Sequence, residues 1–243
     1  VDLSRLLPTE RTAARRILGL PENSFLAAFS ALRLDDARKG GDLLVTAAKA
    51  LAGRIGPEAL TFVTFGGGSV PERMGSFHVH HLGLLRDEQT VALALAAADV
   101  MLVPSREEAG PMITAEALAC GTPVIGFPIG SNRDLLRPGE NGFLATAFSP
   151  ESIADGLAWA LARRDDVRLR YAARDRPLHA ARNRIGRPRA VGLFVLEEGG
   201  DVTEGGKADA EHRRTFRRID HLIEQLLIEA VLETDLCGIG RAG

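Results

Sequence analysis

The sequence has little that would mark an extracellular, membrane-spanning or nucleic-acid-binding protein. Its 243 residues include two cysteines, Cys120 and Cys237. Two are too few for a disulfide framework, so a reducing compartment is expected. The longest apolar runs end well short of the ~20 residues that a membrane-spanning helix needs, and the opening residues do not resemble a signal peptide. The net charge of −2 gives no general attraction to nucleic acid.

The spacing of metal ligands is also missing. Three of the six histidines, His78, His80 and His81, lie on or beside a short apolar segment. This pattern suits a surface strand better than a metal site, so no metal is expected. Lysine is scarce too: only three of the 30 basic residues are lysines, with Lys39 among them. Each lysine position is therefore more notable than it would be in an average sequence.

Short apolar segments alternate with helical segments between residues 9 and 163, and Thr9 is the expected cap of the first helix. The strand segments are continuously apolar, as in strands that are buried on both faces of a sheet. This alternation predicts an α/β fold, with a single Rossmann-like, doubly wound parallel sheet. The expected strands are 25–32, 60–65, 77–82, 100–103, 123–127 and 142–145, and the expected helices are 10–19, 41–52, 87–98, 112–119 and 150–163.

The composition changes after the last of these helices. Residues 163–189 contain ten arginines and three aspartates, which favours a solvated helix face, with membrane-surface or partner contact as the alternative. A glycine-rich, acidic stretch at 199–206 has the composition of a linker. Residues 211–234 form an amphipathic pattern that suits a packing or dimer helix. We therefore expect two parts, an α/β domain over 1–175 and an irregular, partly helical extension over 176–243.

The segment from Pro104 to Gly121 is the most informative of the chain. It contains two glutamates, Glu108 and Glu116, in an E-x7-E spacing. An apolar strand precedes them, and a helix of small residues contains the second. In open α/β sheets, ligands bind outside the carboxyl ends of the strands. The two carboxylates are therefore candidate ligand-binding groups; the alternative is a pair of ordinary surface glutamates near the start of a helix.

Four further motifs accompany this segment in a fixed order. VDLSRLLP opens the chain, Arg33 is followed by Lys39-Gly40, HHLGLL ends the third expected strand, and NGFLA precedes a helix that begins with proline. Together with AAADVMLVPSREEAGPMITAEALACGTPVIGF, these motifs resemble the C-terminal, donor-binding domain of retaining GT-B glycosyltransferases. The resemblance is to the large family 4 that shares the E-x7-E motif, and it extends from residue 1 to about residue 173.

The resemblance implies a role for each matching residue. Arg33 and Lys39 would bind the diphosphate of a nucleotide-sugar donor, the first through its planar fork and the second as a point charge. Glu116 would accept hydrogen bonds from the ribose hydroxyls. Glu108, the catalytic candidate, would face the donor sugar. The other substrate-binding candidates are Gly110, Met112 and Ile113, near a helix N-terminus whose N–H groups suit phosphate, and Leu84, near the base.

The implied reaction is transfer of a hexosyl group, with retention, from a nucleotide-diphosphate sugar to a glycan, lipid or other acceptor. The resemblance implies a place for this reaction in polysaccharide or glycolipid synthesis. The leaving diphosphate would be stabilised electrostatically, and no metal or other cofactor is implied. The implied partners are the donor and a glycan or glycolipid acceptor, with no nucleic acid. The implied location is the cytoplasm, with peripheral contact at the inner membrane face as a variant.

Two departures from the family pattern limit these implications. Pro111 replaces the usual glycine three positions after Glu108, and proline has no N–H to offer a phosphate. The acceptor-binding N-terminal domain of the family also has no counterpart in the sequence. We therefore expect a donor-binding half that works with a separate acceptor subunit. The alternatives are a non-catalytic or truncated nucleotide-sugar-binding module that acts through a partner, and a related phosphorylase or epimerase.

Simpler interpretations stay open for several single residues. Arg33 and Lys39 are also compatible with solvated loop charges. The glycine run 66–68 is as compatible with a plain turn as with a ligand-binding loop. Cys120 is expected to be a small core residue packed beneath the E-x7-E loop.

Overall fold

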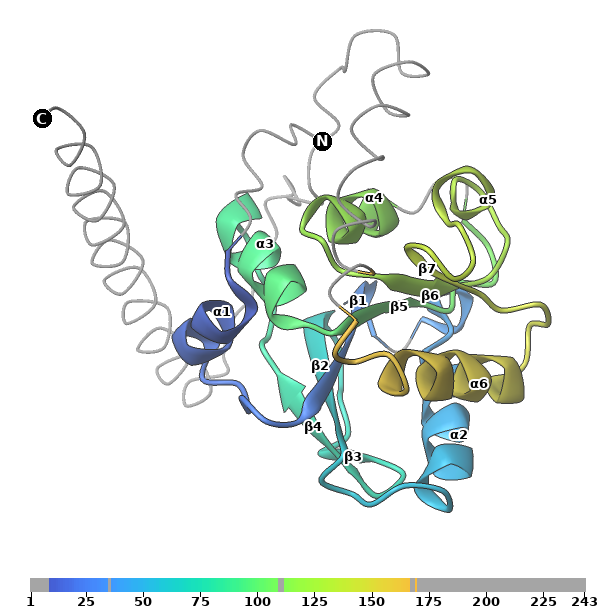
Figure 1. Cartoon of the computed structure of the whole chain (residues 1–243), viewed down its shortest axis with the longest axis horizontal. Coiled ribbons are helices and arrows are strands. Elements are labelled where there is room, and N and C mark those ends of the chain that lie inside the picture. Colours follow the sequence, from blue (N-terminus) through green and yellow to red (C-terminus); the bar gives the residue numbers. More distant parts are fainter. Residues whose placement is uncertain (1–8, 35, 109–111, 167–168, 170–243) are drawn as a thin grey trace, which may run out of the picture. The chain divides into compact units, whose positions relative to one another are not determined.

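The computed structural model describes residues 9–34, 36–108, 112–166 and 169 (Figure 1). The chain divides into two compact units, and all the described residues except Ile17–Gly19 belong to the first. The opening VDLSRLLP motif, the arginine-rich segment beyond residue 169 and the expected helix at 211–234 lie outside the described residues. In the described part of the chain, no helix has the length and apolar character to cross a membrane.

One seven-stranded sheet forms the centre of the fold, in the order β3-β4-β2-β1-β5-β6-β7. All neighbouring strands are parallel except β3, which pairs antiparallel with β4 at one edge. The expected α/β parallel sheet is therefore confirmed. The strands are β1 (Phe25–Arg33), β2 (Leu60–Gly67), β3 (Arg73–Met74), β4 (Phe77–His81), β5 (Val100–Val103), β6 (Val124–Gly126) and β7 (Gly142–Leu144).

Helices cover both faces of this sheet. The pair α2 and α6 packs together on one face, and α3 packs with α4 on the other (Figure 1). The central strands are therefore buried on both sides, which explains why residues 25–29 are all apolar and all buried. The helices are α1 (Arg11–Leu18), α2 (Gly41–Ala52), α3 (Glu88–Ala97), α4 (Met112–Ala119), α5 (Asn132–Leu135) and α6 (Pro150–Leu161), with a 3-10 turn, η2, at Ala37–Lys39.

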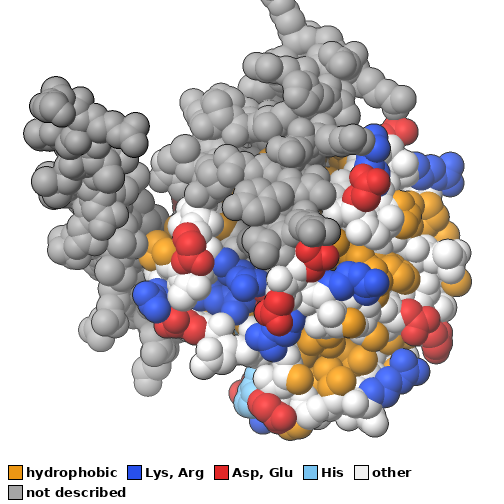
Figure 2. All heavy atoms as spheres, in the orientation of Figure 1, with side chains coloured by type: hydrophobic (Ala, Val, Ile, Leu, Met, Phe, Trp, Pro, Cys, Tyr) orange, Lys and Arg blue, Asp and Glu red, His pale blue; other side chains and the backbone are white. Residues whose placement is uncertain are grey.

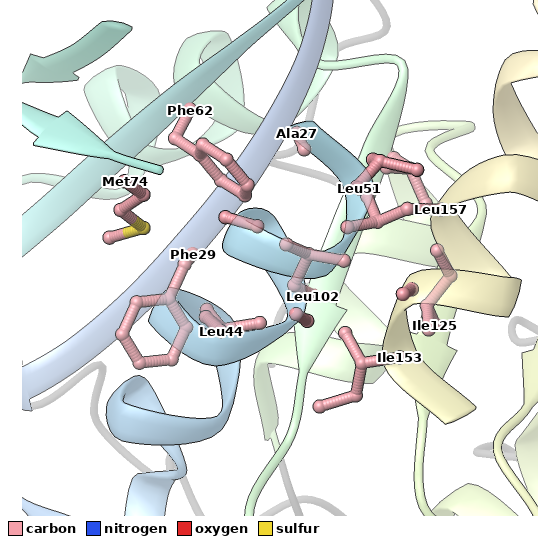
Figure 3. Packing of buried hydrophobic residues seen from close by; sticks show 14 of the residues in the cluster. Ala27, Phe29, Leu44, Leu51, Phe62, Met74, Leu102, Ile125, Ile153 and Leu157 are labelled. Carbon is pink, nitrogen blue, oxygen red and sulfur yellow. The ribbon is translucent and has the colours of Figure 1, made fainter. Parts of the chain in front are cut away.

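The main core lies between the sheet and the α2–α6 layer. Phe29, Leu102 and Ile125 of the sheet meet Leu44 of α2 and Ile153 of α6 (Figure 3). Apolar atoms are also visible on the outer surface over α2 and α6 (Figure 2). Partly buried side chains that pack against this core include Val45, Ala52, Ile55, Trp159 and Leu161.

The strand order reverses between β1 and β5. From β1 the chain builds the sheet in one direction through β2 and β4, and it then returns to the other side of β1 to add β5, β6 and β7. The two strands pair in register, with Ala27 opposite Val100 and Phe29 opposite Leu102. Such a switch point is where the loops after adjacent strands diverge to opposite faces and leave room for a ligand.

Local capping signals account for most helix boundaries. Asp87 caps α3 by accepting a hydrogen bond from the Thr90 N–H at 2.7 Å, and Ser149 caps α6 by accepting from Ser152 at 3.3 Å. The cap of α1 differs from the expectation. The Glu10 carboxylate, one residue after Thr9, accepts the N–H groups of residues 12 and 13 at 2.9 and 2.8 Å. The sequence did not predict β3, α5 or η2, each of which has four residues or fewer.

A buried ion pair joins three elements at the amino-terminal edge of the sheet. Arg15 of α1 is 3% exposed, and its Nη2 donates to Asp99 Oδ2 at 2.6 Å. Its Nε donates to the Ala97 carbonyl at 2.9 Å. The same Asp99 accepts the N–H of Leu26 in β1 at 2.7 Å. Burial lowers the pKa of Arg15, and the adjacent carboxylate opposes that effect. The pair therefore holds α1 to the start of β1 and β5.

Removing this guanidinium should destabilise the fold strongly. We expect Arg15→Met to lower the free energy of unfolding by up to about 3–5 kcal/mol, because it removes the buried partner of Asp99 and leaves that carboxylate paired with the more exposed Arg11. The matched control is Arg16→Met, which breaks an exposed pair with Glu22 at 3.1 Å. That change should leave the urea midpoint almost unmoved. Equal losses in the two variants would contradict the anchoring role of Arg15.

Candidate functional site

The candidate site is built from the two loops that follow β1 and β5 at the carboxyl edge of the sheet. The β1–α2 loop runs through η2 to Gly40, and the β5–α4 loop begins at Pro104. Because β1 and β5 are adjacent and parallel, both loops emerge side by side. The residues expected to bind ligand are thus brought to one edge from positions about 70 apart in the chain.

The first contact between the loops joins two of the predicted site residues. Lys39 Nζ donates to Glu108 Oε1 at 2.9 Å. The side chains are 29% and 20% exposed, so the pair is accessible to solvent but not fully hydrated. A cation and a carboxylate thus stand together at the position where this type of sheet binds ligands.

A second contact was not expected from the sequence. The N–H of Arg106 donates to the Arg38 carbonyl at 2.8 Å, and its guanidinium binds both oxygens of Asp42 at 2.7 and 2.6 Å. The same guanidinium contacts the Ala37 carbonyl. This hydrogen bonding lowers the pKa of Asp42 and raises that of Arg106. The sequence hinted at this contact only through opposite charges: an arginine lies within the E-x7-E segment, and an aspartate lies in the first turn of α2.

The loops also approach each other closely at Gly40. This residue has φ +76°, a left-handed conformation, and ends η2 just before α2. A Cβ added there would lie 2.1 Å from the Pro104 carbonyl oxygen. Only glycine meets both requirements, since the left-handed region is costly for other residues. The glycine of the Lys39-Gly40 motif is therefore required by the contact between the loops.

Arg33 is placed by a bulge at the end of β1. The pairing of β1 with β2 shifts between Ala31 and Arg33, so that Leu32 and Arg33 are both exposed. Opposite this shift, Gly66 has φ +133°, and a Cβ on it would lie 1.8 Å from the Ala31 carbonyl oxygen. The first two glycines of the 66–68 run therefore permit a bulge that re-aims the last side chain of β1, which is more than a plain turn requires.

Glu116 lies one turn into α4 and is buried, with 6% of its surface exposed. None of the described residues donates a hydrogen bond to its carboxylate. Burial raises the pKa of the Glu116 carboxyl above its usual range. A buried carboxylate without a described donor is costly in the free protein, and it is suited to a ligand that brings hydroxyl donors.

The α4 helix that carries Glu116 is fixed from beneath. Thr114 Oγ1 donates to Asn132 Oδ1 at 2.7 Å, and Asn132 Nδ2 donates to the Phe127 carbonyl at 3.0 Å, with both side chains fully buried. Cys120, expected in the core, is buried at the end of this helix. At the other end, Met112 is partly exposed and Ile113 is half-buried, while Gly110 and Pro111 lie outside the described residues.

Leu84 lies on the loop after β4, at the same edge, and is partly exposed. This loop is tied to the end of β2, where the N–H of Gly66 donates to the Gly83 carbonyl at 2.8 Å. Nearby, the hydroxyl of Thr64 and Nδ1 of His81 are 3.0 Å apart. No cluster of three or more metal-ligating side chains occurs among the residues that the structure describes.

Comparison with known proteins identifies the family. Residues 26–163 match the family model of glycosyl transferases, group 1. The chain belongs to this family. The D-inositol 3-phosphate glycosyltransferase of Xylanimonas cellulosilytica is 37% identical, over 80% of this chain and 48% of that protein. The enzyme of the same name from Geodermatophilus obscurus is 34% identical, over 68% of this chain and 39% of that protein. The chain therefore spans less than half the length of these relatives.

Solved structures show where the same fold occurs. The sucrose-phosphate synthase of Thermosynechococcus elongatus has a TM-score of 0.62 and 28% identity, over 73% of this chain and 46% of that one. The C-terminal domain of LpcC, a group 1 glycosyl transferase of Francisella tularensis, has a TM-score of 0.59 and 21% identity. That match covers 76% of this chain and 97% of the LpcC domain. The expected fold, that of a GT-B C-terminal domain, is confirmed.

The close approach at Gly40 gives a prediction about stability. We expect Gly40→Ala to destabilise the protein by more than the roughly 1–2 kcal/mol that a left-handed alanine costs, because the Pro104 carbonyl must also move. Gly139→Ala is the matched control, since Gly139 has φ +84° and no atom within 4 Å of an added Cβ. Urea denaturation of both variants measures the difference, and equal losses would refute the close contact between the loops.

The buried carboxylate gives a prediction about pH. Because the folded-state pKa of Glu116 is raised, ionisation destabilises the fold as the pH rises above the unfolded value of about 4.3. Glu116→Gln should therefore be more stable than the parent at pH 7–8, and this gain should vanish near pH 4. Urea midpoints between pH 4 and 8 test this, with the exposed Glu72→Gln as control. A stability gain that is the same at every pH would contradict the view that ionisation of Glu116 causes it.

Proposed function

We propose that this chain carries the donor site of a retaining glycosyltransferase that uses a nucleotide-diphosphate sugar. The observation that carries the proposal is the contact between Lys39 and Glu108. A cation and a carboxylate meet there, from two loops, at the switch point of a parallel sheet. Membership of the group 1 family supports the reaction class.

The diphosphate would bind between Arg33, Lys39 and the N-terminus of α4. Arg33 supplies a planar fork of donors and Lys39 a point charge, and together they neutralise charge as the sugar departs. The N–H groups of Met112 and Ile113 stand in the first turn of α4, where the helix dipole favours an anion. Gly110 completes the phosphate loop in this proposal, while Pro111 contributes no N–H.

The two glutamates would recognise the ribose and the hexose of the donor. Glu116 accepts hydrogen bonds from the ribose diol, and these donors relieve the cost of its burial. Glu108, on the loop, faces the transferred hexose and the reacting centre, and Lys39 orients its carboxylate in the free protein. Leu84 packs beside the base. The solved HepE protein of Anabaena was crystallised with UDP-glucose, which makes uridine the first base to test here.

The acceptor is a glycan or glycolipid in this proposal. An acceptor-binding domain or subunit completes the active site together with the residues of this chain. The relatives named as D-inositol 3-phosphate glycosyltransferases act on a polar, phosphorylated acceptor by their names. We place the reaction in the cytoplasm, at or near the inner membrane face. Residues 1–175 form the donor domain and 176–243 an extension, as the sequence predicts.

Ligand-induced stabilisation tests the donor site directly. The melting temperature is measured with uridine, guanosine and adenosine diphosphates and their sugars. A ligand at a hundred times its Kd should stabilise the fold by about 2.7 kcal/mol. Glu116→Ala should abolish most of this shift, because it removes the acceptor for the ribose hydroxyls. Glu58→Ala, an exposed change beside the amino end of β2, should preserve it.

The outcomes separate the proposal from its alternative. Stabilisation by one nucleotide family that is lost in Glu116→Ala supports the donor site. No stabilisation by any nucleotide in a folded chain refutes it. A third outcome would favour a non-catalytic nucleotide-sugar-binding module. In that case the chain binds a donor but transfers no sugar when the acceptor-binding part is present, and Glu108→Gln behaves as the parent does in both respects.

A further inference from the structure

The donor site depends on groups from two loops that are not paired with each other as strands. Lys39 follows β1 and Glu108 follows β5, and each loop leaves toward a different face of the sheet. Precise ligand binding requires such groups to be held within about 0.5 Å of their working positions. The side-chain contact of Lys39 with Glu108 cannot fix this spacing, since a bound diphosphate competes for the same ammonium. Another contact must hold the loops together.

Arg106 makes that contact from the middle of the β5–α4 loop. Its backbone N–H and its guanidinium reach three successive sites of the facing segment, namely the carbonyls of Ala37 and Arg38 and the carboxylate of Asp42. The bidentate geometry toward Asp42 fixes direction as well as distance. Asp42 lies in the first turn of α2, so the loop is tied to a helix of twelve residues and not to another loop.

We propose that Arg106 is a positioning residue of the donor site, whose pairing with Asp42 holds Glu108 in register with Lys39. This inference rests on the proposed function. Glu108 stands two residues beyond Arg106, and Lys39 stands three before Asp42, so the ion pair spans the two loops beside the groups that it positions. The close approach of Gly40 to Pro104 sets the separation of the loops at its base.

The pair contributes to position more than to folding. The side chains of Arg106 and Asp42 are 34% and 59% exposed, and ion pairs at that level of exposure add little to stability. Loss of the pair should therefore appear in ligand binding and in local opening, with a small change in the melting temperature. A buried structural pair such as Arg15–Asp99 would behave in the opposite way.

Arg38→Met is the matched control for Arg106→Met. Arg38 is an exposed arginine in the same region, and its side chain pairs with Asp36 inside its own loop at 2.7 Å. Both variants remove one positive charge near the phosphate site, but only one removes a contact between the loops. The difference between them isolates the positioning effect from the loss of charge.

The binding experiment measures the Kd of UDP-glucose by calorimetry on the full chain. We expect Arg106→Met to weaken binding about tenfold relative to Arg38→Met, the equivalent of one charge-assisted hydrogen bond. Arg106→Lys should recover part of the loss, because it keeps one contact to Asp42. When Glu108→Gln is already present, adding Arg106→Met should raise the Kd by less than about twofold, since the effects of coupled residues are not additive. Equal binding by Arg106→Met and Arg38→Met would overturn the inference.

A second measurement does not depend on the ligand. Amide hydrogen exchange of the described residues of the β5–α4 loop should be faster in Arg106→Met than in Arg38→Met, because local opening is no longer opposed by the pair.

If the parent chain binds no nucleotide, the proposed function fails while a faster exchange still supports the tie between the loops. If the parent binds and exchange and affinity are unchanged in Arg106→Met, the positioning role alone fails. A melting temperature lowered by several degrees with unchanged affinity would show a purely structural role.

Discussion

The pairing of β1 with β5 is the constraint on which the rest of the site depends. These two strands run in the same direction, and the chain order reverses between them. Their following loops must therefore emerge at one edge and then separate to opposite faces. Lys39 and Glu108 meet because of this topology, although their positions in the sequence are far apart. The glycine at position 40 and the Arg106–Asp42 pair refine a proximity that the strand order creates.

The two edges of the sheet follow different physical rules. At the amino-terminal edge, Arg15 and Asp99 are buried and hydrogen-bond to each other. Each also makes a hydrogen bond to a backbone group nearby. At the carboxyl edge, Glu116 is buried without a donor among the described residues, and the charged pairs are partly exposed. The buried charges of the amino-terminal edge therefore have partners within the described residues, while the carboxyl edge retains a buried carboxylate whose interactions are incomplete. Such groups are typical of functional sites.

The sequence predicted the elements whose signals are local and strong. Helices α2 and α4 and strand β5 begin and end at the predicted residues, because small and apolar runs between glycines and charged residues define them. The Lys39-Gly40 and E-x7-E motifs pointed to residues that the structure brings into contact at the carboxyl edge of the sheet. Arg106 and Asp42 were missed because a contact between two surface charges leaves no periodic signal. The bulge near Arg33 was missed for a related reason: it depends on Gly66, in a different strand.

In the proposed donor site, the buried carboxylate of Glu116 links donor binding to protonation. A ligand whose hydroxyls donate to this group binds the ionised form, and its pKa in the free protein is already raised by burial. Binding must then expel a proton from the fraction of molecules in which the carboxyl is protonated. For such a ligand, the heat of association would include the ionisation heat of the buffer, and affinity would decline as the solution is acidified. In the proposed site, this single carboxyl group would make occupancy by the donor sensitive to pH.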